Sequence, residues 1–417
     1  MGKTISEKIL GEHAGQEVSA GDMVVARLDY MMAQDGTAPL AIRSFQDMGG
    51  TDVKDPDRVA LCIDHNAPSP MRAVSELHAS MRAFAAAHGL ELNDVGEGVC
   101  HQVMLDRGHV VPGSLVIGAD SHTCTYGGVN AFGTGVGSTD MAAGMMTGKL
   151  WFRVPETIRV TVRGSLAAGV YSKDIALLMA GEMTADGATY QALEIVGPTI
   201  DRLSLDARLT ISNMAVEVGA KTGLMEADGK TLEFFRGRTD ALLKPVSADP
   251  DALYSGEVVL DVDRLEPMVA KPHRVDSVCP VGEVAGTRIS SGLIGTCTNG
   301  RLEDLEAAAR VLQGRQVKPG VTLVVAPASR EVMLEAVRRG MIEVLITGGA
   351  TVMCPGCASC VGTHQGVPGD GDNVISTANR NFKGRMGNPE ASIYLASPAT
   401  VAASCIEGAI CDPRDFT

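Results

Sequence analysis

The sequence has no apolar run long enough to cross a bilayer. A membrane-spanning helix needs about 20 consecutive apolar residues, and no stretch of the 417-residue chain approaches that length. The N-terminal residues also lack the apolar core of a signal peptide. Both absences argue against a membrane protein and a secreted protein. We therefore expect a cytoplasmic protein with no membrane partner.

Basic charge and aromatic side chains are also scarce. The chain has 36 Lys and Arg against 50 Asp and Glu, a formal net charge of −14. Nucleic acids bind to clustered Lys and Arg, so this balance argues against a nucleic-acid partner, although a small basic pocket for an anionic substrate remains compatible with it. Aromatic residues make up 4% of the chain, so the cores must be aliphatic.

The pattern of apolar runs indicates an α/β fold. A buried strand over residues 58–63 is followed by a helix from about 70 to 88 and by a second strand over 114–117, which is the alternation typical of α/β proteins. A chain of this length forms two or three domains. We place boundaries near residues 153 and 283, which gives domains over 1–153, 154–283 and 284–417.

Further elements follow from periodicity and from capping residues. Thr4 and Glu7 form a capping box at the start of a first helix. The region 236–285 is rich in proline and is interpreted as an irregular connection. The remaining predictions are helices over 172–183, 302–312 and 330–339, and strands over 157–162, 291–294, 321–325 and 344–346.

Polar clusters follow several of these strands. In open α/β sheets, ligands bind beyond the carboxyl ends of the strands, which makes such residues functional candidates. A single histidine is more often structural than catalytic, but three in similar positions indicate a site. The clusters are Asp64 with His65, His101 with Gln102, Asp120 with Ser121 and His122, and the glycine-bounded segment 295–300 that contains Cys297.

Cysteine spacing gives the strongest local signal. The chain has ten cysteines, which in a cytoplasmic protein are expected to be reduced, some of them binding metal. Cys357 and Cys360 are separated by two residues, a spacing that lets both thiolates hold one metal or cluster. An iron–sulfur cluster, a zinc site with His364 as a further ligand, and a redox pair are all compatible with this spacing.

Two further segments have alternative interpretations. The glycine-rich residues 133–138 do not match the dinucleotide-binding fingerprint, in which the third glycine comes one residue later, so we interpret them as close packing ahead of a helix. Residues 379–385 hold three cations and two amides. Such a segment is either a solvated turn or a clamp for a carboxylate, to which arginine offers two parallel donors.

Taken in order, these motifs resemble those of the aconitase superfamily, and within it the large subunits of 3-isopropylmalate dehydratase and its relatives. The resemblance runs from about residue 35 to the C-terminus and is most specific at residues 118–123, 295–300 and 379–382. It implies an aconitase-like three-domain α/β/α architecture that lacks the C-terminal swivelling domain.

The resemblance also implies a cofactor. One [4Fe–4S] cluster per chain would be held by Cys297, Cys357 and Cys360, and the fourth iron, without a protein ligand, would act as a Lewis acid on the substrate's hydroxyl group. The chain departs from the family pattern at Cys354, which extends the pair to a run of three cysteines that resembles a ferredoxin run. The setting of Cys297 favours Cys297 as the third ligand.

Further site residues are implied by the same matches. Matches to catalytic positions are Asp64, His65, His101, Asp120, His122 and Glu217. Matches to substrate-binding positions are Gln34, Ser121, Asn213, Asn379, Arg380 and Arg385.

The implied activity is that of a hydro-lyase acting on a hydroxy dicarboxylic or tricarboxylic acid. Interconversion of 2- and 3-isopropylmalate in leucine biosynthesis is the first expectation, and homoaconitate, 2-methylmalate (citraconate) and 2,3-dimethylmalate are alternatives. In single-chain relatives, the swivelling domain supplies a serine base. We therefore expect a separate small subunit, in a heterodimer or heterotetramer, and no turnover by this chain alone. The acidic charge argues against the rival class of cluster-free RNA-binding relatives, and a zinc-stabilised structural subunit is the other rival.

Overall fold

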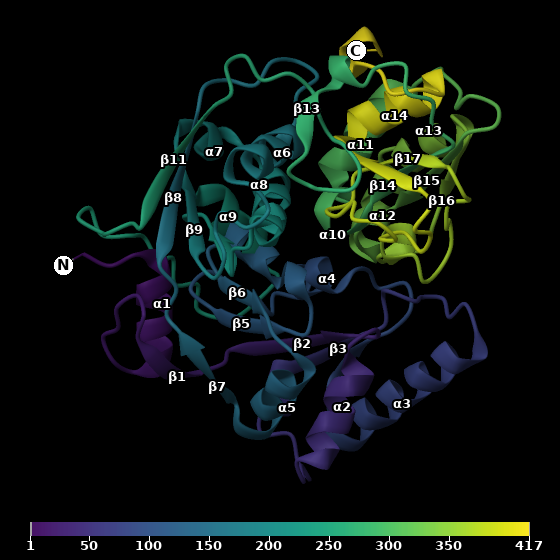
Figure 1. Cartoon of the computed structure of the whole chain (residues 1–417). Helices are drawn as coiled ribbons and strands as arrows, with labels where there is room; N and C mark the ends of the chain where they lie inside the picture. The colour runs from purple at the N-terminus through teal and green to yellow at the C-terminus, as the bar shows by residue number, and fades with distance from the viewer. Residues whose placement is uncertain (1, 417) are drawn as a thin grey trace.

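The structure is a computed structural model that describes residues 2–416. It confirms the α/β class, because three sheets built mainly of parallel strands carry helices on their faces, and a separate two-stranded ribbon packs beside the first sheet (Figure 1). Within residues 2–416, no helix combines the length and the apolar character needed to span a bilayer.

The first sheet occupies the lower half of the molecule in Figure 1. Its strands are all parallel. In sheet order they are β4 (Glu91–Asn93), β3 (Val59–Cys62), β2 (Tyr30–Gln34), β5 (Leu115–Gly118) and β6 (Phe132–Gly135). The helices of this part are α1 (Ile5–Ala14), α2 (Ala38–Asp47), α3 (Arg72–His88), α4 (Cys100–Asp106) and α5 (Ser138–Thr147), with the short 3-10 helices η1 (Pro56–Arg58) and η2 (Ser121–Val129).

The second sheet lies at the upper left of Figure 1 and is also parallel throughout. In order it contains β10 (Thr222–Leu224), β9 (Ala192–Val196), β8 (Thr157–Arg163) and β11 (Gly256–Asp261). Its helices are α6 (Ser172–Met183), α7 (Pro198–Arg202), α8 (Leu205–Asn213), η3 (Met214–Val218) and α9 (Gly229–Phe235).

The third sheet lies at the upper right of Figure 1. Its strands are parallel except at β12, which pairs antiparallel with β13 and with β18. In order it contains β13 (Val278–Pro280), β12 (Met268–Ala270), β18 (Ser392–Leu395), β17 (Asn373–Ser376), β14 (Ser291–Gly295), β15 (Thr322–Ala326) and β16 (Ala350–Val352). Its helices are η4 (Val281–Glu283), α10 (Thr296–Asn299), α11 (Leu302–Leu312), α12 (Arg330–Arg338), α13 (Met341–Thr347), η5 (Ala358–Val361), α14 (Pro398–Glu407) and η6 (Pro413–Phe416).

The outer ribbon is the antiparallel pair of β1 (Met23–Arg27) and β7 (Lys149–Arg153). Its side chains alternate between buried and exposed along both strands. The buried set consists of Val24, Ala26, Leu150 and Phe152, which join the core of the first sheet. The exposed set therefore faces away from that core.

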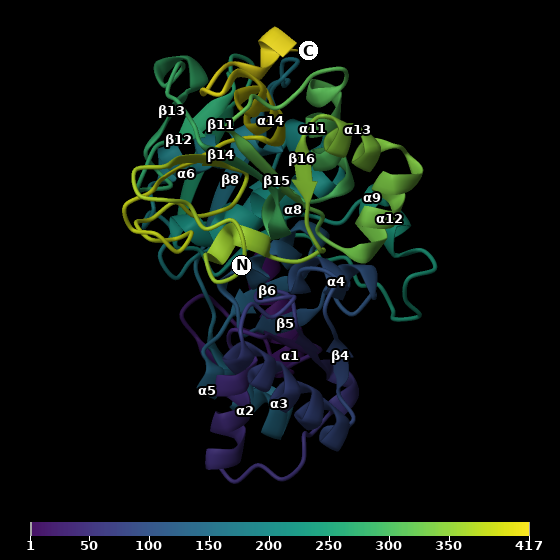
Figure 2. The same ribbon diagram turned by 90° about the vertical axis from the view of Figure 1, so that its right-hand side faces the viewer.

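The three parts meet at the middle of the molecule, where Figures 1 and 2 both place α4 directly below the upper parts. The aliphatic cores extend to this junction. Cys297 belongs to a core formed around α4 and η2, whereas Cys357 and Cys360 belong to the core of the second sheet. The junction thus brings these three cysteines, from the C-terminal part of the chain, next to the strand ends of the first sheet.

Most sequence-based elements are confirmed, and two interpretations were wrong. The helices at 172–183 and 302–312 are α6 and α11, and the capping box of Thr4 and Glu7 is present. Residues 344–346 lie in α13, not in a strand, because a short apolar run does not by itself distinguish the two. The region 236–285 contains three strands, two of which join the third sheet. The domain boundaries stay a prediction.

Candidate active site

The site begins at the carboxyl ends of the first sheet. Gln34 is the last residue of β2, Asp64 and His65 follow β3, and Asp120 follows β5. Because these strands are parallel, their ends share one edge, and the side chains meet there. The amide Nε2 of Gln34 lies 3.4 Å from Oδ2 of Asp120, and Nε2 of His65 lies 3.7 Å from the same oxygen.

Asp120 is the centre of a histidine network. Its Oδ1 lies 2.9 Å from Nε2 of His101 and accepts the backbone N–H of His122 at 2.8 Å. Burial alone would raise the pKa of Asp120, but the hydrogen bonds with His101 and His122 hold that pKa well below its usual range. Asp120 is therefore a carboxylate that orients two imidazoles.

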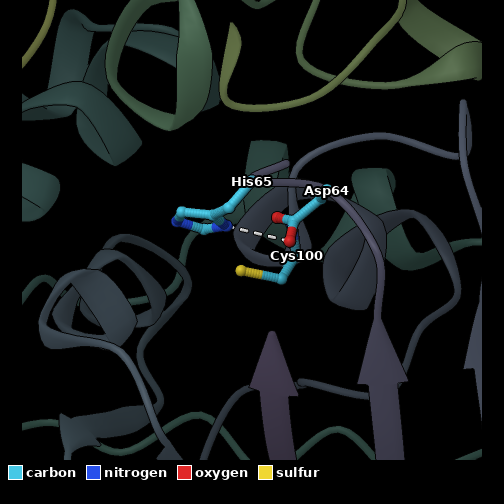
Figure 3. A group of neighbouring side chains, drawn as sticks. All are labelled: Asp64, His65 and Cys100. Atoms are coloured by element: carbon cyan, nitrogen blue, oxygen red, sulfur yellow. Dashed lines mark hydrogen bonds and ion pairs between the residues drawn. The ribbon is translucent and has the colours of Figure 1, made fainter. Parts of the chain in front are cut away.

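Asp64 and His65 form a second acid–imidazole pair, which Figure 3 shows beside Cys100. Nδ1 of His65 lies 2.9 Å from Oδ1 of Asp64, and Oδ2 of Asp64 accepts the N–H of Cys100 at 2.7 Å. Burial would lower the pKa of His65, but the charge of Asp64 and its hydrogen bond outweigh it and raise that pKa to about 10. His65 is thus an imidazolium at neutral pH.

Potential ligand atoms of Asp64, His65 and Cys100 lie within 4.8 Å of one another, a spacing that a metal ion would also require. The Asp64 carboxylate is already hydrogen-bonded on both oxygens, to His65 and to the backbone N–H of Cys100, which argues against a separate metal centre here. The group is a hydrogen-bonded acid–imidazole pair beside a buried thiol.

Three cysteines converge at the junction. Cys297 lies in α10, and Cys357 and Cys360 lie at η5; all three are buried. They line one cavity of about 170 Å³. Among residues 2–416, Cys354 is not part of this lining, and it is only half-buried. The structure therefore brings together the predicted set and keeps the additional cysteine apart.

Polar donors surround these sulfurs. The amides of Asn213 and Asn379 point their Nδ2 atoms at Sγ of Cys297, at 3.4 and 3.5 Å. Nη2 of Arg385 lies 3.2 Å from Sγ of Cys360. A hydrogen bond from the Cys357 thiol, and next the Arg385 guanidinium, lower the pKa of Cys360 well below its usual value. Amide and guanidinium donors aimed at sulfur suit thiolates that hold a metal cluster.

Glu217, from η3 beside the second sheet, links this edge to the arginine segment. Its Oε1 lies 2.8 Å from both Nε2 of His122 and Nε of Arg380. Burial would raise the pKa of Glu217, but the hydrogen bond with His122 lowers it, and Arg380 lowers it further. The pKa of His122 is raised, because its bonds to Asp120 and Glu217 outweigh the effect of burial.

Most predicted site residues surround the same cavity. The lining includes Gln34, His65, His101, Asp120, Ser121, His122, Cys297, Cys357, Cys360, Asn379, Arg380 and Arg385. The other three, Asp64, Asn213 and Glu217, are each hydrogen-bonded to a lining residue. Two buried nitrogens, Nδ1 of His101 and Nε of Arg385, have no partner within residues 2–416, so the cavity retains polar groups for a ligand.

Two buried cations were missed from the sequence. Arg301 is completely buried; its guanidinium donates to the backbone oxygens of Cys297 and Thr298 at 2.8 and 3.0 Å and to Oε1 of Gln102 at 2.9 Å. Its position directly after the segment 295–300 was the one signal available. Arg301 ties α10, which contains Cys297, to the helix that carries His101.

Lys173, in α6, is the second buried cation. Its Nζ donates to the backbone oxygens of Thr377 and Ala378 at 2.9 and 2.7 Å, immediately before Asn379 and Arg380. Burial lowers the pKa of Lys173 to about 8. Nothing in the sequence marks this lysine, because its partners lie about 200 residues away.

Comparisons with known proteins show the family of the chain. The sequence model of the aconitase family (aconitate hydratase) matches residues 7–288 and 282–408. The chain belongs to the aconitase family. Relatives that are similar to this chain are named as large subunits, which implies a separate small subunit in those proteins.

The relatives are similar over their full length. A 3-isopropylmalate dehydratase large subunit 2 from Archaeoglobus fulgidus is 53% identical, with all of both chains covered. A large subunit 1 of the same name from Thermotoga maritima is 52% identical, also with full coverage. A probable methanogen homoaconitase large subunit from Methanosarcina mazei is 50% identical, covering 94% of this chain and all of the relative.

A solved structure supports the fold. Aconitase X from Thermococcus kodakaraensis, in its holo-form, aligns with a TM-score of 0.50 at 12% identity and covers 90% of this chain and 89% of that chain. At this identity the likeness concerns the fold alone. It agrees with the aconitase-like architecture predicted from the motifs.

Proposed function

We propose that this chain is the cluster-bearing large subunit of 3-isopropylmalate dehydratase, which interconverts 2-isopropylmalate and 3-isopropylmalate in leucine biosynthesis. The observation that carries the proposal is the 170 Å³ cavity in which three buried cysteines face an Asp–His network and two arginines. The names of relatives that are about half identical over the whole chain support the same activity. We place the enzyme in the cytoplasm, in line with ten unpaired cysteines.

The residues present fit one [4Fe–4S] cluster. Cys297, Cys357 and Cys360 would hold it, and the donors from Asn213, Asn379 and Arg385 would stabilise charge on the sulfurs. When bound, such a cluster with one iron free of protein ligands supplies a Lewis acid for a substrate oxygen.

The chain's own side chains supply protons and orientation at the hydroxyl group. The pKa of His65 is raised to about 10, so His65 holds a proton at neutral pH beside the cavity. The pKa of His122 is also raised, by its bonds to Asp120 and Glu217. Asp120 fixes the imidazole of His101, whose Nδ1 has no other partner among the described residues. We assign to these histidines the protonation of the departing hydroxide.

Substrate carboxylates are assigned to the arginine segment. Arg385 has a buried Nε without a partner in the described chain, and Arg380 is held in place by Glu217. A guanidinium offers two parallel donors to a carboxylate. Gln34 and Ser121, which also line the cavity, would bind the second carboxylate.

The proposal includes a separate small subunit, in a heterodimer or heterotetramer. Relatives bear the name of large subunit, and we assign to the small subunit the base that removes the substrate's carbon-bound proton. General base catalysis contributes about 10²–10⁴-fold. We therefore expect no appreciable turnover by the chain alone, even when it is loaded with cluster.

Homoaconitase is the second candidate, because relatives that are 50% and 47% identical carry that name. The decisive experiment reconstitutes the chain anaerobically, adds the small subunit from the same source, and compares kcat/KM for 3-isopropylmalate and for homoisocitrate. We expect the preference to be for 3-isopropylmalate. A preference for homoisocitrate would favour the second candidate, and turnover by the chain alone would contradict the assignment of the base.

A further inference from the structure

A second, larger cavity adjoins the active site. It has a volume of about 760 Å³ and lies between the first and second sheets. Asp120 and Ser121 line both this cavity and the 170 Å³ cavity of the active site. A partner protein bound in the larger cavity would therefore contact the wall that this cavity shares with the active site.

The outer ribbon borders this cavity and exposes an unusual face. A sheet that packs on a core with one side usually presents polar residues on the other. Here, Met23 and Val25 are each 62% exposed, and Trp151, which lies opposite Val25, is 52% exposed. Single exposed apolar residues are normal, but adjoining ones indicate a contact surface.

The apolar face continues into the cavity with a change to positive charge. Arg153 lies opposite Met23 on the ribbon, and its guanidinium lies over the ring of Tyr190 at 5.9 Å. Nζ of Lys221 lies over the same ring at 4.6 Å. Arg153, Tyr190 and Lys221 all line the cavity. We call this surface the docking face: Met23, Val25, Trp151, Arg153, Tyr190 and Lys221.

The charges of the docking face favour an acidic occupant. Within residues 2–416, neither Arg153 nor Lys221 forms an ion pair within 4 Å; both are engaged with the Tyr190 ring. A second copy bound through the same face would bring its own Arg153 and Lys221 against these cations, which disfavours a second copy as the occupant.

We propose that the docking face binds the small subunit and thereby places that subunit's base at the wall shared by the two cavities. This inference rests on the proposed function, which requires such a partner. The matching surface of the small subunit would combine an apolar centre, seated on Trp151, with carboxylates that pair with Arg153 and Lys221. Tryptophan and arginine at the centre of an interface commonly dominate its affinity.

Trp151 gives a direct probe, because it is the only tryptophan in the chain. The cluster-loaded chain is labelled with 5-fluorotryptophan and titrated with unlabelled small subunit, and the fluorine resonance is followed by NMR. We expect the resonance to shift in step with complex formation. An unchanged resonance in a complex that forms would overturn the inference, as would a shift produced by concentrating the labelled chain alone.

Variants test the energetics by calorimetric titration with the small subunit. Trp151→Ser and Arg153→Glu should each weaken binding by about tenfold or more. The matched controls are Ile346→Ser and Arg338→Glu, on α13 and α12, which are 56% and 70% exposed. Figure 1 shows α13 far from β7. The controls should bind as the wild type does.

The outcomes separate this inference from the proposed function. Every variant should keep the iron content and absorption spectrum of the wild type, because the docking face contains no cysteine. Wild-type affinity in Trp151→Ser and Arg153→Glu, in an active complex, would refute the docking face alone. Conversely, a complex that depends on Trp151 but dehydrates no hydroxy acid would refute the proposed function and leave the docking face standing.

Discussion

Replacing Arg301 with methionine should destabilise the chain, because two buried oxygens lose their hydrogen-bond donor. The wild-type guanidinium serves the backbone oxygens of Cys297 and Thr298 and Oε1 of Gln102. Methionine retains most of the apolar stem and removes the donors. The oxygen of Thr298 keeps its bond from Oγ1 of Thr210 at 2.9 Å, so the oxygens of Cys297 and Gln102 are the ones that lose their partner.

The magnitude follows from these two acceptors. A buried acceptor left unsatisfied costs about 1–3 kcal/mol, which gives a gross cost of about 2–6 kcal/mol. Removing a buried charge also removes its desolvation penalty and offsets part of that cost. We therefore expect the free energy of unfolding to fall by about 2–4 kcal/mol. The free energy of unfolding of Arg301→Lys should lie between those of the wild type and of Arg301→Met, because an ammonium cannot reproduce the planar fork of the guanidinium.

The assay is urea unfolding of the cluster-free chain, followed by circular dichroism, so that cluster loss does not enter the result. The matched control is Arg310→Met on α11, an arginine that is 64% exposed and pairs with Glu306 at 3.0 Å. Exposed pairs of this kind contribute about 0–1 kcal/mol. A loss in Arg301→Met no larger than that in the control would refute the role given to Arg301.

Two further predictions concern the site. Lys173→Met should raise KM for the hydroxy acid roughly tenfold with unchanged iron content, because about 1.4 kcal/mol of binding is lost when the carbonyls before Asn379 and Arg380 lose their donor. Steady-state kinetics and iron analysis would check this, and an unchanged KM would contradict it. The folded state raises the pKa of His65 from 6.5 to about 10, so this proton stabilises the fold at low pH, and its contribution should decline by up to ~1.4 kcal/mol per pH unit as pH rises from 6.5 to 10. Unfolding measured across this window should show the decline in the wild type and a smaller one in His65→Asn; equal slopes would contradict the shift.

Much of the site could be predicted from the ends of the strands. Asp64 and Asp120 each come two residues after an apolar strand, and parallel pairing places such positions at one edge. The meeting of Cys297 with Cys357 and Cys360 did not follow from spacing, because Cys297 lies 60 positions before Cys357. It was implied by the family resemblance. Periodicity could not identify α13, whose apolar segment is as short as a strand.

The roles of residues with distant partners did not follow from the sequence pattern. Glu217 lies in an apolar segment and was found through the family resemblance alone; the fold brings it into contact with His122 and Arg380. Arg301 and Lys173 are cations inside cores, which composition alone would place on the surface. Each is stabilised by backbone oxygens of loops that the fold brings to it.

Iron and sulfide analysis of the anaerobically reconstituted chain, with its electron paramagnetic resonance spectrum, tests the central claim most directly. The comparison includes the wild type, Cys297→Ser and Cys354→Ser. We predict a cluster in the wild type and in Cys354→Ser and its loss in Cys297→Ser, because Cys297 lines the cavity with Cys357 and Cys360. Retention of the cluster in Cys297→Ser together with its loss in Cys354→Ser would contradict the account.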